Sequence, residues 1–168
     1  MLRSSLHCAL VLFGIATACA AAPVSPSNPL VPHETRQLVN LRQVTRLDCL
    51  YTAGLLVSGR DAPRTLAGLA RLLGEKRIAG ADVLERPEAP ATRGYACLLY
   101  MKALGEQGGV LYRLTGPSER YAYKHLKFLR LIPEGGSGLP ITGPELVSLL
   151  ALSRPRMSRL HPERNPAR

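Results

Sequence analysis

The pattern of hydrophobic and polar positions predicts helices, and three of the helical stretches share one beginning. Each opens with an aliphatic residue or alanine, then a threonine, and continues with apolar residues three or four positions apart. The threonines are Thr45, Thr92 and Thr142, spaced by 47 and then 50 residues. Threonine is a favoured N-cap residue. We therefore expect helices over 44–59, 91–105 and 141–153.

The residues beside these threonines support the predicted helix starts to different degrees. Thr142 and Glu145 have the spacing of a capping box, in which each side chain accepts a hydrogen bond from the other's backbone N–H. Thr45 and Asp48 form a weaker version of it. The middle stretch has Tyr95 where a carboxylate is expected. Its start therefore depends on Thr92 and on packing.

Two further amphipathic stretches, 63–74 and 118–132, lie between the threonine-initiated helices, and 34–43 fits a short helix. No long run alternates apolar and polar residues, so strands beyond a short pair are not expected. A period of 47–50 residues is typical of stacked supersecondary units. The predicted fold class is all-α, a helical repeat bundle of about three helix–loop–helix units over 34–153, with irregular connecting loops.

The first 20 residues have the pattern of an export signal. Arg3 precedes an apolar run over 9–18, which is too short for a membrane-spanning helix and is soon followed by prolines. The end of the run is similar to a bacterial lipobox, so cleavage before Cys19 would expose it for lipid attachment. Cleavage between Ala20 and Ala21 is the alternative. Residues 21–33, rich in Pro and Ser, would then be an extended tether. We expect an exported protein of the periplasm or cell envelope, anchored to the membrane by lipid if Cys19 is modified.

Two cysteines remain after the signal, Cys49 and Cys97, and both lie in the second turn of a threonine-initiated helix. An exported protein is in an oxidising setting, so we predict that they form a disulfide. The alternative is a pair of small buried apolar side chains. No Cys-x-x-Cys spacing or paired histidines accompany them, so no metal site is expected.

The formal net charge is +10 at pH 7, which favours an anionic partner. Much of the excess lies in 154–168, where three prolines accompany five arginines. We expect this segment to be a basic disordered tail. It would contact phospholipid headgroups or wall polymer, or would only aid solubility. Export makes nucleic acid the least expected partner.

The motifs of common enzyme classes are missing from the sequence. It contains no His-Glu-x-x-His, phosphate loop, dinucleotide fingerprint or Gly-x-Ser-x-Gly elbow. Asp48 and Glu145 are explained by helix capping. We therefore expect no catalytic residues, no cofactor and a non-enzymatic function.

The chain resembles the S-layer homology domain family of bacterial cell envelopes over about 44–153. The similar segments are 44–48 (Val-Thr-Arg-Leu-Asp), 91–96 (Ala-Thr-Arg-Gly-Tyr-Ala) and 120–146, where a Tyr-Ala pair and a Gly-rich loop precede the third threonine. The family's repeats begin a helix with Thr-Arg-Ala-Glu after an Ile or Val. The third motif has Gly143 in place of the arginine.

The resemblance implies a threefold-like bundle with the three threonine-initiated helices at its centre. It also implies binding of anionic cell-wall polysaccharide or peptidoglycan in grooves between repeats, with Arg46 and Arg93 as ligand-binding residues. A guanidinium suits this because it can hold a carboxylate through two hydrogen bonds. The alternative is that both arginines are solvated first-turn residues that bind no ligand.

Two functions therefore remain open from the sequence. The first is a non-catalytic envelope module that binds anionic wall polymer. The second is a structural or assembly lipoprotein that docks on another envelope protein through its helical bundle.

Overall fold

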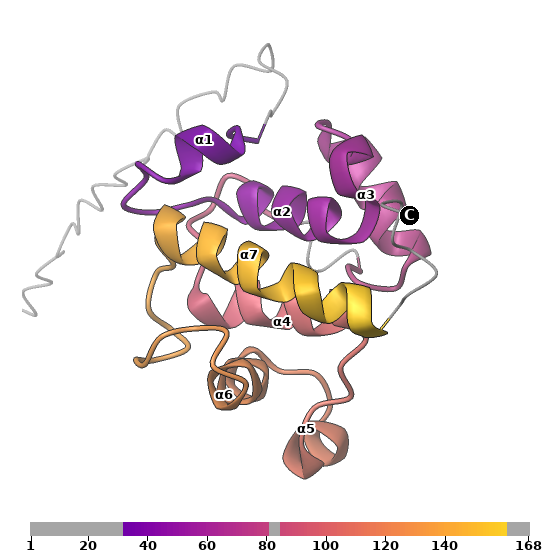
Figure 1. Ribbon diagram of the computed structural model, residues 1–168, viewed down its shortest axis with the longest axis vertical. Helices are drawn as coiled ribbons and strands as arrows, with labels where there is room; N and C mark the ends of the chain where they lie inside the picture. The colour runs from indigo at the N-terminus through magenta and orange to yellow at the C-terminus, as the bar shows by residue number, and fades with distance from the viewer. Residues whose placement is uncertain (1–31, 81–84, 161–168) are drawn as a thin grey trace, which may run out of the picture.

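The computed structural model describes residues 32–80 and 85–160, and it contains helices but no strands over these ranges. The all-α class is thereby confirmed. Figure 1 shows the arrangement. The helices are α1 (Thr35–Leu38), α2 (Arg46–Ser58), the 3₁₀ helix η1 (Gly59–Asp61), α3 (Leu66–Glu75), α4 (Arg93–Leu104), α5 (Val110–Thr115), α6 (Glu119–Phe128) and α7 (Gly143–Leu160).

Each threonine-initiated helix begins where the sequence predicts. The Thr45 hydroxyl accepts from the Asp48 backbone N–H (3.2 Å). Thr92 accepts likewise from Tyr95 (3.0 Å), and Thr142 from Glu145 (3.4 Å). These bonds satisfy backbone donors that a helix start would otherwise leave without partners. At its other end α4 stops at Gly105, which has the left-handed conformation (φ +71°).

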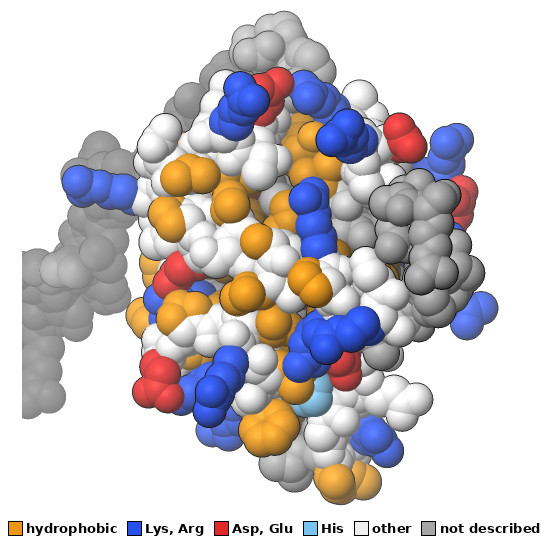
Figure 2. Space-filling model, in the orientation of Figure 1, with side chains coloured by type: hydrophobic (Ala, Val, Ile, Leu, Met, Phe, Trp, Pro, Cys, Tyr) orange, Lys and Arg blue, Asp and Glu red, His pale blue; other side chains and the backbone are white. Residues whose placement is uncertain are grey.

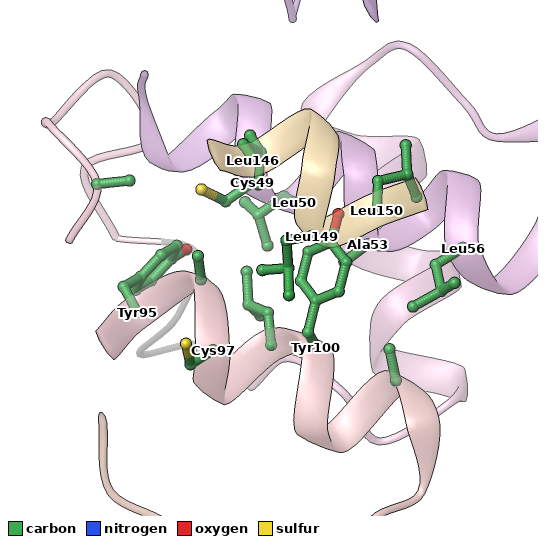
Figure 3. Packing of buried hydrophobic residues seen from close by; sticks show 14 of the residues in the cluster. Cys49, Leu50, Ala53, Leu56, Tyr95, Cys97, Tyr100, Leu146, Leu149 and Leu150 are labelled. Carbon is green, nitrogen blue, oxygen red and sulfur yellow. The ribbon is translucent and has the colours of Figure 1, made fainter. Parts of the chain in front are cut away.

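The three threonine-initiated helices, α2, α4 and α7, pack against one another in the middle of the molecule. Helix α3 covers α2 and α6 covers α4, whereas α7 is covered by the four-residue α1. Aliphatic, cysteine and tyrosine side chains fill the space between the central helices (Figure 3). Leu50, Leu149 and Tyr100 are at most 1 % exposed. Their burial supplies the main driving force for the arrangement.

The chain segments that lead into the three threonines are joined by backbone hydrogen bonds in a closed cycle. The Val44 N–H donates to the Ile141 carbonyl (3.3 Å), the Ile141 N–H to Ala91 (3.1 Å), and the Ala91 N–H to Val44 (2.9 Å). All three side chains are fully buried. The cycle therefore holds the three helix starts beside one another.

The first helical residue of each central helix also donates its N–H to a loop. Arg46 donates to the carbonyl of Ala89 and Arg93 to that of Leu139. Gly143 donates to Leu41 (2.9 Å) in the same way. Because these N–H groups are satisfied inside the fold, they are not free to bind an anion, and any recognition must come from side chains.

Two predictions are wrong over residues 154–160: that the third helix ends at 153, and that a disordered tail begins at 154. Helix α7 passes through Pro155 and continues to Leu160. Proline removes one helical hydrogen bond, but the last turns are anchored by tertiary contacts. Met157 is buried, and the Arg156 guanidinium pairs with Glu106 (3.3 Å). Residues 161–168 of the predicted tail lie outside the described residues, as do the predicted signal, Cys19 and nearly all of the predicted tether.

The disulfide predicted between Cys49 and Cys97 is not formed. Both cysteines are free and buried (Figure 3), which matches the alternative of two small apolar side chains. Cys49 is four residues after its threonine and Cys97 five after its own. One residue rotates a helical side chain by about 100°, so the two thiols leave their helices in different directions. Burial raises the pKa of each thiol.

Candidate functional site

Arg93, one of the two predicted ligand-binding arginines, is neutralised inside the protein. Its Nη2 lies 2.5 Å from Oε1 of Glu145 and its Nε lies 3.4 Å from Oε2. Its Nη1 donates to the Glu134 carbonyl (3.2 Å). The Arg93 side chain is only 14 % exposed. The sequence-based view of Arg93 as an exposed first-turn residue is therefore wrong, because α7 supplies a carboxylate that covers it.

Glu145 has two roles in this pair. It completes the predicted capping box, since its Oε2 accepts from the Thr142 backbone N–H (3.1 Å). Its carboxylate also receives Arg93, and so connects the starts of α4 and α7. Burial acts to raise the pKa of Glu145, but the hydrogen bonds from Arg93 and Thr142 outweigh it and the pKa is lowered. The ionised pair is thus part of the folded structure.

Arg46 occupies the same register position in α2 as Arg93 in α4, but its surroundings differ. Its guanidinium lies 5.0 Å from the centre of the Tyr95 ring, and its Nη1 donates to the Glu85 carbonyl (3.3 Å). Within the described part of the chain no carboxylate pairs with Arg46. The difference arises from one position: three residues after the threonine, α7 has Glu145 and α4 has Tyr95.

The position in α7 that is equivalent to Arg46 and Arg93 is occupied by Gly143, which has no side chain. A Cβ atom there would lie 1.5 Å from the carbonyl oxygen of Leu38. An arginine at this position is therefore excluded by the backbone next to α1. In its place the fold puts a histidine from the segment before α1 against the start of α2.

That histidine, His33, binds the fully buried Asp48. Asp48 accepts from the His33 backbone N–H (2.9 Å), lies 3.0 Å from His33 Nδ1, and accepts from the backbone N–H (2.9 Å) and hydroxyl (2.7 Å) of Thr45. A buried carboxylate needs such a set of partners. The pair fastens the segment before α1 to the start of α2.

The sequence did not reveal two of these partners. His33 comes from the segment before α1, and Glu119 of α6 accepts a hydrogen bond from the Thr92 hydroxyl (2.9 Å). Glu119 thus binds the capping threonine of α4, whose own capping-box position is occupied by Tyr95 and not by a carboxylate. The missing capping residue in α4 was the only hint that another segment would contribute one.

Among 32–80 and 85–160 no three His, Cys, Asp or Glu side chains gather in a way that could hold a metal ion. Over the same ranges no helix is both long enough and apolar enough to cross a membrane. Of the two predicted ligand-binding arginines, only Arg93 has a carboxylate partner among the described residues, whereas Arg46 is half-buried against Tyr95.

Comparison with protein-family models, with curated proteins and with solved structures gave no match.

Proposed function

We propose that this chain is a non-catalytic, exported cell-envelope protein whose helical bundle binds an anionic wall polymer through Arg46. The observation that carries the proposal is the contrast between two arginines in one register position. Arg93 is paired with Glu145, whereas Arg46 faces an aromatic ring and has no carboxylate partner among the described residues. An external carboxylate would give Arg46 the partner that Glu145 gives Arg93.

A repeat organisation similar to S-layer homology domains is part of the same proposal. The cycle of hydrogen bonds among Val44, Ala91 and Ile141 supports three equivalent units around one axis. The matching loop contacts at the first residues of α2, α4 and α7 support it as well. On this view the first residue of each central helix meets the third residue of the next central helix. The contacts at the three junctions are Arg46 with Tyr95, Arg93 with Glu145, and, where Gly143 offers no side chain, His33 with Asp48.

The chemistry of the Arg46 groove suits an acidic sugar. A guanidinium is permanently charged and forms two parallel hydrogen bonds with a carboxylate or phosphate. Stacking on Tyr95 orients its plane and reduces the mobility that binding would otherwise cost. The net charge of +10 adds a general attraction for anionic polymers. Unlike this general attraction, the Arg46–Tyr95 contact holds the guanidinium in a defined position.

Sedimentation with purified peptidoglycan sacculi that retain their acidic polymers tests this proposal. We expect Arg46→Ala to weaken binding tenfold or more, because a lost charge-assisted hydrogen bond costs about 1.5–3 kcal/mol. Arg46→Lys keeps the charge but loses the paired hydrogen bonds, so it should also bind more weakly. Arg71→Ala is the matched control, since Arg71 on α3 is 83 % exposed and far from the threonine register.

Deletion of 161–168 separates specific from general attraction. If binding is lost with these residues and with added salt, but is unchanged in Arg46→Ala, the groove is not the site. The second function, docking of the bundle on another envelope protein, would then be favoured. An uncovered helix face gives that function a specific location.

A further inference from the structure

We propose that the outward face of α7 is a docking site for an acidic amphipathic helix of a partner protein. The proposal starts from an asymmetry in the bundle. Helices α2 and α4 are covered by α3 and α6, which have ten residues each. Helix α7 has 18 residues, and α1, which packs on it, has four. Most of the α7 face has no covering helix within the described part of the chain.

Comparing burial at equivalent positions of the three central helices locates the uncovered surface of α7. Nine residues after their threonines, Gly54 in α2 and Met101 in α4 are buried. A Cβ on Gly54 would touch Leu69 of α3, which shows that the outer helix covers this position. The matching residue of α7, Ala151, is exposed. The next residue, Leu152, is 50 % exposed.

A groove of about 550 Å³ runs along this surface between the end of α6 and α7. Phe128, which is 82 % exposed, forms one side, and Leu152 with Ser148 forms the other. Leu131 and Ile132 lie beneath and are buried. Figure 2 shows hydrophobic side chains over α7 with Lys and Arg side chains beside them. A groove with an apolar floor, beside a helix whose outward residues include Ser148, Ala151 and Leu152, suits another helix.

The charges around the groove indicate the chemistry of the occupant. Lys127 is paired with Glu134 at 3.0 Å. Arg130 in the groove, and Arg154 and Arg159 on α7, have no carboxylate partner among the described residues. Three unmatched guanidinium groups favour a helix with acidic flanks. They disfavour a second copy of this chain, because each copy has a net charge of +10.

The length of the occupant follows from the two outer helices already present. A helix of about ten residues, comparable with α3 and α6, would cover α7 from Ser148 to Pro155. Its apolar residues would recur three and four positions apart, as in α6, which buries Ala122, Tyr123 and Leu126. Asp or Glu on either side of that stripe would meet Arg130 and Arg154.

A stapled peptide derived from α6 tests the proposal on the full-length protein. It has the sequence of residues 118–129 with Arg120, Lys124 and Lys127 changed to Glu, so that the apolar stripe is kept and its flanks become acidic. We expect saturable binding by fluorescence anisotropy that weakens at least tenfold in Ala151→Glu and in Leu152→Glu. The peptide with its original Lys and Arg residues should bind at least tenfold more weakly.

Two variants serve as controls. Leu114→Glu changes an equally apolar residue that is 77 % exposed on α5 and should leave peptide binding unchanged. Arg46→Ala should also leave it unchanged, which separates this face from the proposed polymer groove. Circular dichroism melts check that Ala151→Glu and Leu152→Glu keep the fold, as their exposure leads us to expect.

Several results would overturn the proposal. The acidic peptide could fail to bind, or could bind Ala151→Glu as tightly as the wild type. Light scattering could find a dimer that Ala151→Glu dissociates, which would assign the face to a second copy. Anionic phospholipid vesicles could bind the wild type but not Ala151→Glu, which would assign the face to a lipid surface.

Discussion

Replacing Arg93 by alanine should destabilise the protein at least twice as much as the same change at Arg46. Both residues open a central helix in the same register, so sequence alone treats them alike. In the structure Arg93 makes two contacts with Glu145 and is 14 % exposed, while Arg46 lies over Tyr95. The prediction therefore rests on tertiary contacts alone.

The expected magnitudes follow from these contacts. Removing Arg93 takes away a bidentate, charge-assisted pair and leaves the Glu145 carboxylate, which is 17 % exposed, without its cation. Such a loss costs about 2–3 kcal/mol, between the values typical of charged hydrogen bonds and of fully buried ion pairs. Arg46→Ala removes one backbone hydrogen bond and a cation–π contact, which together contribute about 1 kcal/mol or less.

Urea denaturation followed by circular dichroism at neutral pH measures the difference. With a slope of about 1.5–2 kcal/mol per molar urea, Arg93→Ala should lower the midpoint by about 1–2 M, and Arg46→Ala by less than half of that. A double-mutant cycle with Glu145→Ala isolates the pair, because the capping contribution of Glu145 is present in both backgrounds.

The pH dependence provides an independent check. The pKa of Glu145 is lowered in the folded protein, so its stabilising effect is complete at neutral pH and is lost as the pH falls through the folded value. The gap in midpoint between wild type and Arg93→Ala should therefore shrink between pH 7 and about pH 3. Equal losses at Arg46 and Arg93, or a gap that stays constant into acid, would refute the reasoning.

Two further predictions concern glycine and cysteine positions. Gly143→Ala should lower the free energy of unfolding by about 1–3 kcal/mol or more, because its Cβ would meet the Leu38 carbonyl. Gly74→Ala, whose Cβ would meet nothing within 4 Å, should raise it by about 0.5–1 kcal/mol. Thermal melts of the two variants check this, and a Gly143→Ala protein as stable as wild type would contradict the packing at α1. Cys49 and Cys97 should resist thiol reagents in the native protein and react only after denaturation, since both are buried with raised pKa. Intact mass spectrometry after alkylation with and without denaturant measures this, and a non-reduced mass two hydrogens lower than that of the dithiol would instead establish a disulfide.

Local interactions encoded in the sequence were enough to predict most of the helices of the bundle and the starts of the three central ones. Thr45, Thr92 and Thr142 mark helix starts because a threonine hydroxyl satisfies backbone donors three residues away, which is a purely local interaction. Apolar spacing predicted the helical stretches that became α3 and α6, although their ends differ by several residues. The short α5, flanked by glycines, gave no comparable signal.

Only the tertiary structure decided which contacts the side chain at each equivalent position of the three threonine-initiated helices would make. The charge of Arg93 is balanced by Glu145, which lies 52 residues further along the chain, while Arg46 lies over Tyr95 instead. Long-range packing likewise carries α7 through Pro155, since the burial of Met157 and the Arg156–Glu106 pair outweigh one lost helical hydrogen bond. Cys49 is four residues after its threonine and Cys97 is five after its own. Whether this difference prevents a disulfide depends on how α2 and α4 face each other, and in the structure both thiols are free. Such outcomes depend on distances between segments remote in sequence, which no local pattern encodes.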